Sequence, residues 1–586
     1  MKNTKRLFSL VLAVVMLFSL AACGNQNEEE PTTSTKPQSE SVPATTEPNE
    51  LAWLNTDGGF PIVKEGTEKT LSIYVEQTAE YGAPEDSWFY RYIEEEMNIN
   101  LDITTYTPDN KKEFLSLAFA SNELPDIIIG ANFSTAELLN YGELEGQLLD
   151  LAPYINETYM PNLYGIYQEF PELKTLVTSP AGNVWSLGCI GSTSPRGGDQ
   201  RFFMNYDWLE QCGLEVPTTL DEFIDAMRTF KAEGLCEYPI GGAFASEHPG
   251  VYILNAMGYV GANAKAYRIC LRDGKAVMPL ADREAFGDYL KVMNQLYEEG
   301  LIHPDFFTMD RNSIYAIFAE GVGFLAQAPF ACTPNYTEYW CAPPLTSQWN
   351  DTAAIPTGTG GSIGGVIVSA ACKEPELAAK FIDAFYSTEQ DNVFRKSMSG
   401  PSAKETDILY GMVSGYDFDE NGVIFYADYE NNKDAYANSN DYLVKHITLW
   451  SFGLFGYDSW ARDLTSPQYA GEPDASAYED PSVLRKDPAI SADGNKHYEY
   501  AMQTVLTPYA TDEKFPSIVY LDAELSTELA NLLPALRSYA EPEIAKFITG
   551  ARPLTDEELD DYFTNLEKLG STEYVKAYQD YMDSVQ

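Results

Sequence analysis

Apolar and polar positions alternate after residue 69 in a way that predicts a sheet covered by helices. Residues 70–75 (TLSIYV), 99–106 (INLDITTY) and 124–129 (LPDIII) have the composition of strands. Between them, residues 87–98 and 111–122 place their apolar side chains at helical spacing. A strand–helix–strand–helix–strand order is typical of a mostly parallel sheet with helices on its faces. The sequence therefore predicts an α/β fold for this part of the chain.

The ends of these strands also predict where a ligand would bind. In open parallel sheets, ligands lie beyond the carboxyl ends of the strands. Here those ends lead into the loops near Gln77–Trp88 and Gly130–Thr135. We therefore expect a candidate site at these two loops.

A second α/β unit begins near residue 202. Residues 202–212 (FFMNYDWLEQC) predict a strand that runs into a helix. Thr218 or Thr219 can cap the next helix, and the two acidic residues that follow suit its positive N-terminal end. Residues 365–372 predict another strand, which leads into a helix over 375–386. The C-terminal part of the chain is mostly amphipathic helix.

The first 22 residues have the pattern of an export signal. Three basic residues precede an apolar run from Phe8 to Leu20, which is too short to span a bilayer. The run ends in L-A-A-C, which resembles a bacterial lipobox with Cys23 as the lipidated N-terminus. The alternative is an ordinary secretory signal with a chance cysteine. The lipobox interpretation places the mature protein on the cell membrane, lipid-anchored at its extracellular face.

The segment over residues 23–68 is predicted to be a lipidated cysteine followed by a disordered acidic tether. Residues 24–50 contain only two aliphatic side chains, Val42 and Ala44, and four prolines. Such a segment cannot bury enough apolar surface to offset the entropy of ordering it. No second apolar stretch of membrane length follows, so we expect the lipid anchor to be the only contact with the membrane.

The charge of the chain excludes one class of partner. With 38 Lys+Arg and 88 Asp+Glu, the formal net charge is −50 at pH 7. Phosphate binding needs a basic patch, and the basic residues here are scattered, so we expect no nucleic acid. Hydrophobic residues make up 44% of the chain, which is ample for large buried cores.

Cysteines and histidines do not indicate a disulfide scaffold or a metal centre. Seven cysteines remain after Cys23, an odd number at wide spacing, so most are expected to be buried thiols. Cys332 and Cys341 could pair, and the sequence does not decide this. The four histidines lie far apart and form no metal-ligating pair. We expect no cofactor.

Seven segments, taken in order, resemble one known family. The chain is similar to bacterial extracellular solute-binding proteins, the lipoprotein receptors of ABC importers, and to their large oligosaccharide-type branch (family 1). The segments are 123–128 (ELPDII), 148–155 (LLDLAPYI), 205–223 (NYDWLEQCGLEVPTTLDEF), 296–307 (LYEEGLIHPDFF), 373–387 (KEPELAAKFIDAFYS), 541–550 (EPEIAKFITG) and 573–583 (EYVKAYQDYMD).

The resemblance implies a two-lobed periplasmic-binding-protein-like (type II) α/β fold with a ligand cleft between the lobes. By analogy, lobe one covers about 69–190 and 366–510, and lobe two covers about 200–360 and 515–586. The family closes its lobes around a ligand and then docks on ABC permease subunits. The implied ligand is a carbohydrate, an oligosaccharide, and the implied protein is a monomer that does no catalysis.

A sugar needs planar aromatic side chains for its ring faces and polar side chains for its hydroxyl groups. We therefore select such residues near the loops that are predicted to face the cleft. Each also has a core-packing alternative, because tryptophan is usually part-buried whatever its function. The candidates are Trp88, Asn132, Trp185, Arg201, Tyr206, Trp340 and Trp450.

Two further motifs have competing interpretations. Gly360–Gly364 (GGSIG) has the spacing of a hydrolase nucleophile elbow, but a loop precedes Ser362 and a strand is predicted after it, so a flexible loop is favoured. Residues 417–428 are close to a calcium loop or form a hairpin with an Asn-Gly turn, and the hairpin is favoured. The calcium alternative would use Asp417, Asp419, Asn421 and Asp428.

Three other functions stay open at this point. A cell-surface glycoside hydrolase would also use aromatic and acidic residues, but no segment selects two of the 88 acids as a catalytic pair. A receptor for peptide rather than sugar would share the fold. An anchored adhesin or scaffold would need no deep cleft.

Overall fold

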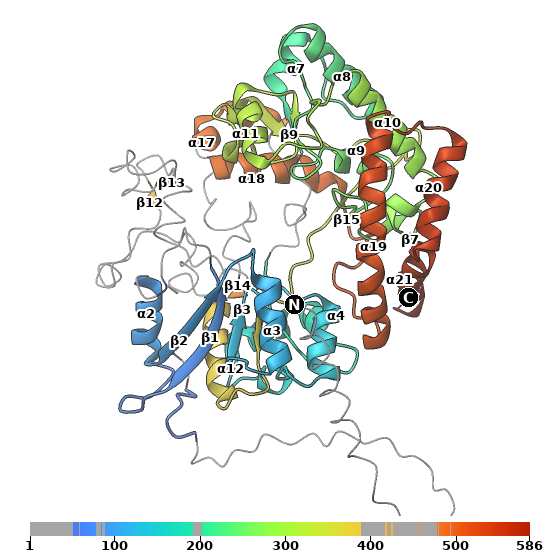
Figure 1. Ribbon diagram of the computed structural model, residues 1–586. Helices are drawn as coiled ribbons and strands as arrows, with labels where there is room; N and C mark the ends of the chain where they lie inside the picture. The colour runs from blue at the N-terminus through green and yellow to red at the C-terminus, as the bar shows by residue number, and fades with distance from the viewer. Residues whose placement is uncertain are drawn as a thin grey trace, which may run out of the picture. The chain divides into compact units, whose positions relative to one another are not determined.

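The computed structural model describes residues 51–57, 59–77, 84, 88–191, 202–387, 417–418, 424–425, 456–457, 478, 480–492 and 494–585 (Figure 1). Within these ranges, no helix is both long enough and apolar enough to cross a membrane. The predicted signal peptide, the predicted lipidation site Cys23 and most of the predicted tether lie outside the described residues. The last part of the predicted tether is ordered instead, because Leu54 and Val63 pair with each other and are buried in a core with β1.

Strands and helices alternate along the chain as the sequence pattern predicts. The strands are β1 (Thr70–Glu76), β2 (Asn100–Tyr106), β3 (Ile127–Ile129), β4 (Cys189–Ile190), β5 (Phe203–Asn205), β6 (Cys270–Arg272), β7 (Lys275–Val277), β8 (Phe324–Leu325), β9 (Tyr339–Cys341), β10 (Ile355–Pro356), β11 (Val366–Val368), β12 (Asp417–Phe418), β13 (Ile424–Phe425), β14 (Gly456–Tyr457) and β15 (Ala510–Thr511).

The helices are longest near the C-terminus. The α-helices are α2 (Trp88–Met97), α3 (Lys111–Ser121), α4 (Thr135–Leu139), α5 (Pro161–Glu169), α6 (Pro171–Val177), α7 (Tyr206–Cys212), α8 (Leu220–Ala232), α9 (Gly250–Ala256), α10 (Phe286–Glu298), α11 (Arg311–Glu320), α12 (Pro375–Asp383), α17 (Pro488–Ser491), α18 (Gly494–Leu506), α19 (Ala523–Ile548), α20 (Asp556–Lys568) and α21 (Ser571–Val585). Short 3-10 or π turns are η3 (Asn140–Leu144), η4 (Ala152–Tyr154), η6 (Pro279–Ala281), η7 (Pro329–Ala331), η8 (Tyr336–Glu338), η9 (Ala384–Tyr386), η14 (Pro481–Lys486) and η15 (Thr507–Tyr509).

Lobe one contains a four-stranded sheet in the order β11-β3-β1-β2. Strand β1 pairs in parallel with both β2 and β3, whereas β11 returns from far along the chain and pairs antiparallel with β3. The mostly parallel sheet predicted from the sequence is therefore confirmed. Its edge strand β11 fixes the segment after residue 365 onto the N-terminal part of the chain.

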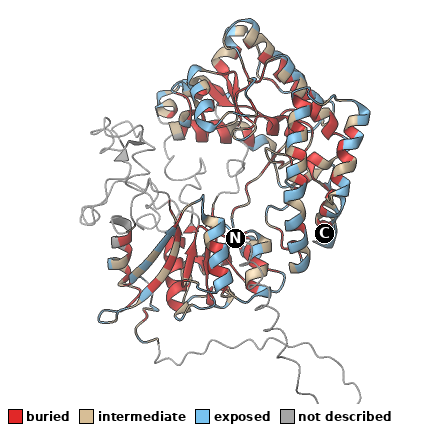
Figure 2. Cartoon of the chain, in the orientation of Figure 1, coloured by how far each residue is buried: buried red, intermediate tan, exposed pale blue. Residues whose placement is uncertain are grey.

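Alternating side chains of this sheet supply two cores, one on each face. Leu71, Ile73 and Val75 of β1 share a core with helices α2, α5 and α12. Ile128 of β3 and Ile367 of β11 point the other way and share a core with helices α3 and α4. Successive side chains of a strand point to opposite faces of the sheet. A sheet that helices cover on both sides therefore needs apolar residues on both faces of its strands. Figure 2 shows the buried positions concentrated on the strands and on the helix faces turned toward them.

Lobe two contains a three-stranded antiparallel sheet in the order β8-β5-β9. The strand predicted after residue 202 is β5, and it runs directly into α7. The next helix, α8, starts with a capping box in which Thr219 and Glu222 exchange hydrogen bonds between side chain and backbone. The predicted helix start is therefore confirmed. Helices α19, α20 and α21 form a contacting group (Figure 1).

The segment from η14 to α18 packs with lobe two. Arg485, whose side chain is 4% exposed, forms an ion pair with Asp207 of α7 at 3.0 Å. The Sγ atom of Cys341 in β9 lies 3.6 Å from the Sδ atom of Met502 in α18. Leu484, Ile490, Met502 and Leu506 thus belong to the lobe-two core. The boundary expected from the sequence, which ended lobe one near residue 510, differs from this packing.

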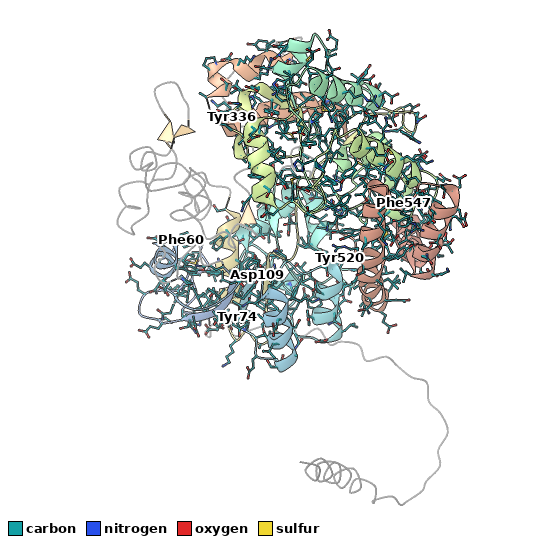
Figure 3. The ribbon with its side chains drawn as sticks, turned by 45° about the horizontal axis from the view of Figure 1, so that its top comes forward. Phe60, Tyr74, Asp109, Tyr336, Tyr520 and Phe547 are labelled. Carbon is teal, nitrogen blue, oxygen red and sulfur yellow. The ribbon has the colours of Figure 1, made fainter. Side chains whose placement is uncertain are left out.

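Residues 355–359 and 510–514, far apart in the sequence, lie side by side. Strand β10 pairs in parallel with β15, and the Lys514 ammonium donates to the carbonyl of Gly358 at 2.9 Å. Burial lowers the pKa of Lys514. A few residues later, the hydroxyl of Tyr520, labelled in Figure 3, donates to the carbonyl of Val177 in lobe one at 3.5 Å. The first two contacts hold residues 355–359 and 510–514 together, and the third joins Tyr520 to lobe one.

Candidate functional site

Three neighbouring cavities lie where the lobes meet and just inside lobe two. The first, of about 890 Å³, and the second, of about 580 Å³, both include Ser134 and Thr135 of lobe one among lobe-two residues. The third, of about 530 Å³, is lined by lobe-two residues and shares Asn263, Tyr267 and Arg268 with the second. Their sizes fall in the range of ligand pockets. The described residues therefore form an inter-lobe cleft with a side chamber in lobe two.

The lobe-one wall of the cleft is the loop that follows β3. The backbone N–H of Asn132 donates to the carbonyl of Gly364 at 2.8 Å, which ties this loop to the segment before β11. Gly364 has φ of +80°, and a Cβ there would lie 2.7 Å from the backbone of Phe133. Only glycine fits so close an approach in this conformation. The loop Gly130–Thr135 was predicted as a site from strand order, and its residues Phe133, Ser134 and Thr135 line the cavities.

The opposite wall is helix α19. It contains two internal prolines, Pro534 and Pro542, and both line the first cavity. A proline has no N–H, so the carbonyls four residues earlier, at Ala530 and Ser538, lose their usual helical donor. Both of those residues also line the first cavity. This wall therefore offers hydrogen-bond acceptors within a largely apolar surface.

Aromatic side chains supply most of the flat surface of the cleft. Phe244 and Phe307 lie with ring centroids 5.2 Å apart, and Tyr574 and Tyr578, one turn apart on α21, have the same separation. Both pairs line the first cavity. Burial raises the pKa of Tyr574, so its hydroxyl is neutral and can donate a hydrogen bond. Flat rings beside neutral donors suit a ligand with C–H faces and hydroxyl groups.

Charged side chains near these rings are paired with one another. The guanidinium of Arg537 stacks 4.5 Å from the ring centroid of Tyr267 and pairs with Glu541 at 3.1 Å. Lys265 pairs with the same carboxylate at 3.3 Å. Asn263 accepts at its side-chain oxygen from the backbone N–H groups of Tyr267 and Arg268, both at 3.0 Å. These pairings fix the orientation of the Tyr267 ring between the second and third cavities.

Three of the aromatic candidates selected from the sequence lie in cores. Trp340 in β9 is 0% exposed, and its ring lies 5.0 Å from that of His497. Trp185 is 7% exposed and packs on Gly142, where a Cβ would lie 2.4 Å from the indole. Tyr206 donates its hydroxyl to the carbonyl of Cys341 at 3.1 Å. These positions favour the packing alternative, and ligand contact by these residues stays a prediction.

The remaining four candidates can be placed only in part. Asn132 is exposed and has φ of +52°, directly before the cavity residue Phe133. Trp88 begins α2. Arg201 and Trp450 lie outside the described residues. None of the tryptophans whose side chains are described lines any of the three cavities.

The motifs with two interpretations can be placed in part. Strands β12 and β13 pair antiparallel, as the hairpin interpretation predicts, but Asp417 pairs with Phe425. A two-residue Asn-Gly turn would instead pair it with Tyr426, so the register differs by one residue. The other three calcium candidates, Asp419, Asn421 and Asp428, lie outside the described residues. Among the described residues, no cluster of His, Cys, Asp or Glu could hold a metal ion.

The surroundings of Ser362, Cys332 and Cys341 indicate structural roles. The hydroxyl of Ser362 accepts from the backbone N–H of Cys189 at 2.9 Å, and strand β11 follows four residues later. The residue therefore lacks the strand–turn–helix context of a nucleophile elbow. Cys332 and Cys341 are both free, buried thiols.

Most residues that line the cavities were not among the candidates selected from the sequence. Tyrosine and phenylalanine, not tryptophan, supply the aromatic surface, and Glu247, Tyr267 and Arg537 were not selected. One signal was present: Tyr574 and Tyr578 are four residues apart within the segment 573–583, which places them on one helix face. The loop residues carry no such periodicity.

Sequence comparisons show which known proteins the chain resembles. Residues 77–392, more than half of the chain, match the family described as bacterial extracellular solute-binding protein. The chain is 26% identical over 600 residues to the fructooligosaccharide ABC transporter substrate-binding protein FusA of Streptococcus pneumoniae serotype 4, which covers 99% of this chain and 98% of FusA.

Solved structures share the fold. S. pneumoniae FusA in complex with kestose matches with a TM-score of 0.65 at 22% identity, over 88% of this chain and 99% of that one. An extracellular solute-binding protein from Bifidobacterium longum subsp. infantis matches with a TM-score of 0.66 at 17% identity, over 89% and 99%. These likenesses confirm the predicted two-lobed α/β fold of the periplasmic-binding-protein type. The chain belongs to the bacterial extracellular solute-binding protein family.

Proposed function

We propose that this protein is the extracellular substrate-binding component of an ABC importer and that it captures an oligosaccharide in the inter-lobe cleft. The observation that carries the proposal is the cleft itself, whose first cavity is lined by the aromatic pairs Phe244–Phe307 and Tyr574–Tyr578 together with polar loop residues of lobe one. Ring faces and hydroxyl groups are the two surfaces that a sugar presents. The fructooligosaccharide-binding relative FusA, aligned over nearly the whole chain, supports the same ligand class.

The proposal extends to how the protein is held and what it does with its ligand. Cys23 is acylated and anchors the mature monomer at the extracellular face of the cell membrane. The ligand leaves chemically unchanged, and the closed form delivers it to the permease subunits. Radiolabelled palmitate should label the wild-type protein in cells and not a Cys23→Ala variant; equal labelling of both would remove the anchor.

Calorimetric titration of the purified protein tests the ligand class. The panel contains kestose and longer fructooligosaccharides, malto-oligosaccharides, oligogalacturonates and a mixture of oligopeptides. We expect a dissociation constant in the micromolar range or below, on the order of −8 kcal/mol or stronger, for at least one neutral glycan. Binding of peptides alone would reassign the ligand, and new reducing ends after incubation would make the protein a hydrolase.

Replacing Tyr578 by alanine should weaken glycan binding roughly 5- to 30-fold. Tyr578 lines both inter-lobe cavities, so its ring is placed to contact a ligand that spans them. Removing an aromatic ring that stacks on a ligand costs about 1–2 kcal/mol. Tyr581→Ala is the matched control, because Tyr581 is a partly buried tyrosine on the same helix that lines none of the three cavities. Equal losses in the two variants would point to a general effect on α21.

A further inference from the structure

The chain passes from lobe two to lobe one between Ile355 and Gly361. Ile355 lies in the lobe-two core. Gly361 pairs with Ile190, which lies in the lobe-one core that includes β1. Residues 356–360 therefore form a crossing segment, and a movement of one lobe relative to the other must bend it.

A second segment, residues 510–514, lies along this crossing segment and is flanked on both sides by lobe two. Leu506 before it and Phe515 after it both lie in the lobe-two core. Its strand β15 pairs in parallel with β10, and the Thr511 carbonyl accepts from the backbone N–H of Thr357 at 3.0 Å. We call residues 510–514 the strap, because they attach the crossing segment to lobe two.

The Lys514 ammonium fastens the strap to the crossing segment. It donates to the Thr357 carbonyl, to the Thr357 hydroxyl oxygen at 2.9 Å and to the Gly358 carbonyl at 2.9 Å. An ammonium has three N–H donors and no acceptor. All three donors are therefore used within the protein, although the side chain lines the second cavity. Hydrogen bonds from a charged donor are among the stronger ones, so Lys514 acts here as a cross-link.

Asp512 completes a clamp of three residues with Lys514 and Thr357. Its Oδ1 atom accepts from the Thr357 hydroxyl at 2.6 Å, which leaves the lone pairs of that hydroxyl for Lys514. Burial lowers the pKa of Lys514, and the charge of Asp512 opposes this effect. Asp512 is exposed and lines none of the three cavities. It therefore belongs to the clamp and has no place at the ligand.

The clamp leaves a very short stretch of the crossing segment free to bend. On the lobe-two side, the last fixed group is the Gly358 carbonyl, which Lys514 holds. On the lobe-one side, the first fixed group is the Gly360 carbonyl, which accepts from the Gly191 N–H at 2.9 Å. Thr359 and the bonds of the two flanking glycines lie between these points. Gly360 has φ of +70°, and glycine changes such angles without the steric cost of a Cβ.

We propose that Lys514 is a positioning residue for lobe closure: together with Asp512 it clamps the crossing segment to lobe two, so that closure bends the chain at Thr359 and not at residues 356–358. The inference rests on the proposed function and adds to it a residue that controls how the cleft closes. A hinge of few bonds has little freedom in the open form, so closing it on a ligand costs little conformational entropy. Lys514 thus raises the affinity without contacting the ligand.

Hydrogen exchange followed by mass spectrometry tests the clamp in the ligand-free protein. Lys514→Met keeps an unbranched side chain and removes all three donors. We expect the backbone amides of residues 355–359 to exchange about 10-fold faster than in the wild type, because they open locally more often. Peptides from β1 should exchange at the wild-type rate, and the melting temperature should stay within about 3 °C of the wild-type value. Unchanged exchange in residues 355–359 would overturn the clamp.

Asp512→Ala tests the effect on affinity, since Asp512 is part of the clamp and lies outside the cavities. For the glycan that binds the wild-type protein, starting with kestose, we expect calorimetric titration to show an affinity roughly 3- to 20-fold lower in both Asp512→Ala and Lys514→Met. Glu513→Ala is the matched control. It removes the same charge from the neighbouring exposed position of the strap, and it should bind as the wild type does.

The outcomes separate this inference from the proposed function. Wild-type affinity in Asp512→Ala, with glycan binding intact, would overturn the positioning role and leave the receptor function standing. A loss confined to Lys514→Met would also overturn it, because the ammonium would then contact the ligand. If the wild-type protein binds no glycan, the proposed function fails, and the exchange of residues 355–359 still decides the clamp. If Lys514→Met does not fold, Asp512→Ala serves for both measurements: faster exchange and weaker binding support the proposal, and a wild-type value of either contradicts it.

Discussion

Replacing Trp340 by alanine is expected to lower the free energy of unfolding by roughly 3–5 kcal/mol, which is typical of removing a fully buried aromatic ring. Trp340 is 0% exposed in the central region of lobe two, and its indole meets the ring of His497 nearly edge-on at 5.0 Å. Affinity for glycan in the protein that remains folded should be unchanged, because the indole lines none of the three cavities.

Urea denaturation followed by far-ultraviolet circular dichroism measures this loss, and calorimetry under native conditions measures affinity. Trp340→Phe is the matched control, since it keeps an aromatic ring and removes an indole N–H that is buried without a partner. We expect it to cost less than half as much as alanine. Loss of glycan affinity at unchanged stability would instead show that Trp340 contacts the ligand, as the sequence first suggested.

The contrast between Trp340 and Ser134 shows what the sequence could and could not predict. Ser134 and Thr135 lie in the cleft because they follow β3, and the rule that places ligands at strand ends depends only on the order of elements. Trp340 was selected for its residue type, but burial is a property of the tertiary fold. Strand β9, which carries it, has three residues and gives too short a pattern for its burial to be inferred.

Glu247 and Tyr267 could not be predicted for a different reason. Both lie in loops of lobe two, where no helical or strand period relates neighbouring side chains in space. Glu247 meets Gln327 eighty residues later, and Arg537 reaches Tyr267 from α19. Contacts over such distances are set by how the lobe packs. The fold could be predicted from local periodicity and segment order, whereas most of the cleft could not.

Lowering the pH from about 6.5 toward 3 should destabilise the protein through two buried histidines. Burial, with a contribution from Lys265, lowers the pKa of His248 to about 3, and burial together with Arg485 does the same for His497. In the unfolded chain both rings titrate near 6.5. Between these values the unfolded state binds more protons than the folded state, so stability falls as the pH falls. Each histidine contributes up to about 1.4 kcal/mol per pH unit in this window.

Denaturation curves recorded at several pH values between 4 and 8 test how much of this effect comes from His497. In His497→Phe, the free energy of unfolding should depend on pH less steeply than in the wild type, by up to about 1.4 kcal/mol per pH unit. The substitution keeps a ring against Trp340 and removes Nε2, which is buried without a partner. Tyr336→Phe is the control: its ring lies 5.4 Å from that of His497, and its hydroxyl bonds the carbonyl of Ser491. It should change the free energy of unfolding by the same amount at every pH, because it removes no group that titrates in this window. A wild-type slope in His497→Phe would mean that His497 is already charged in the folded protein, where Arg485 would oppose that charge.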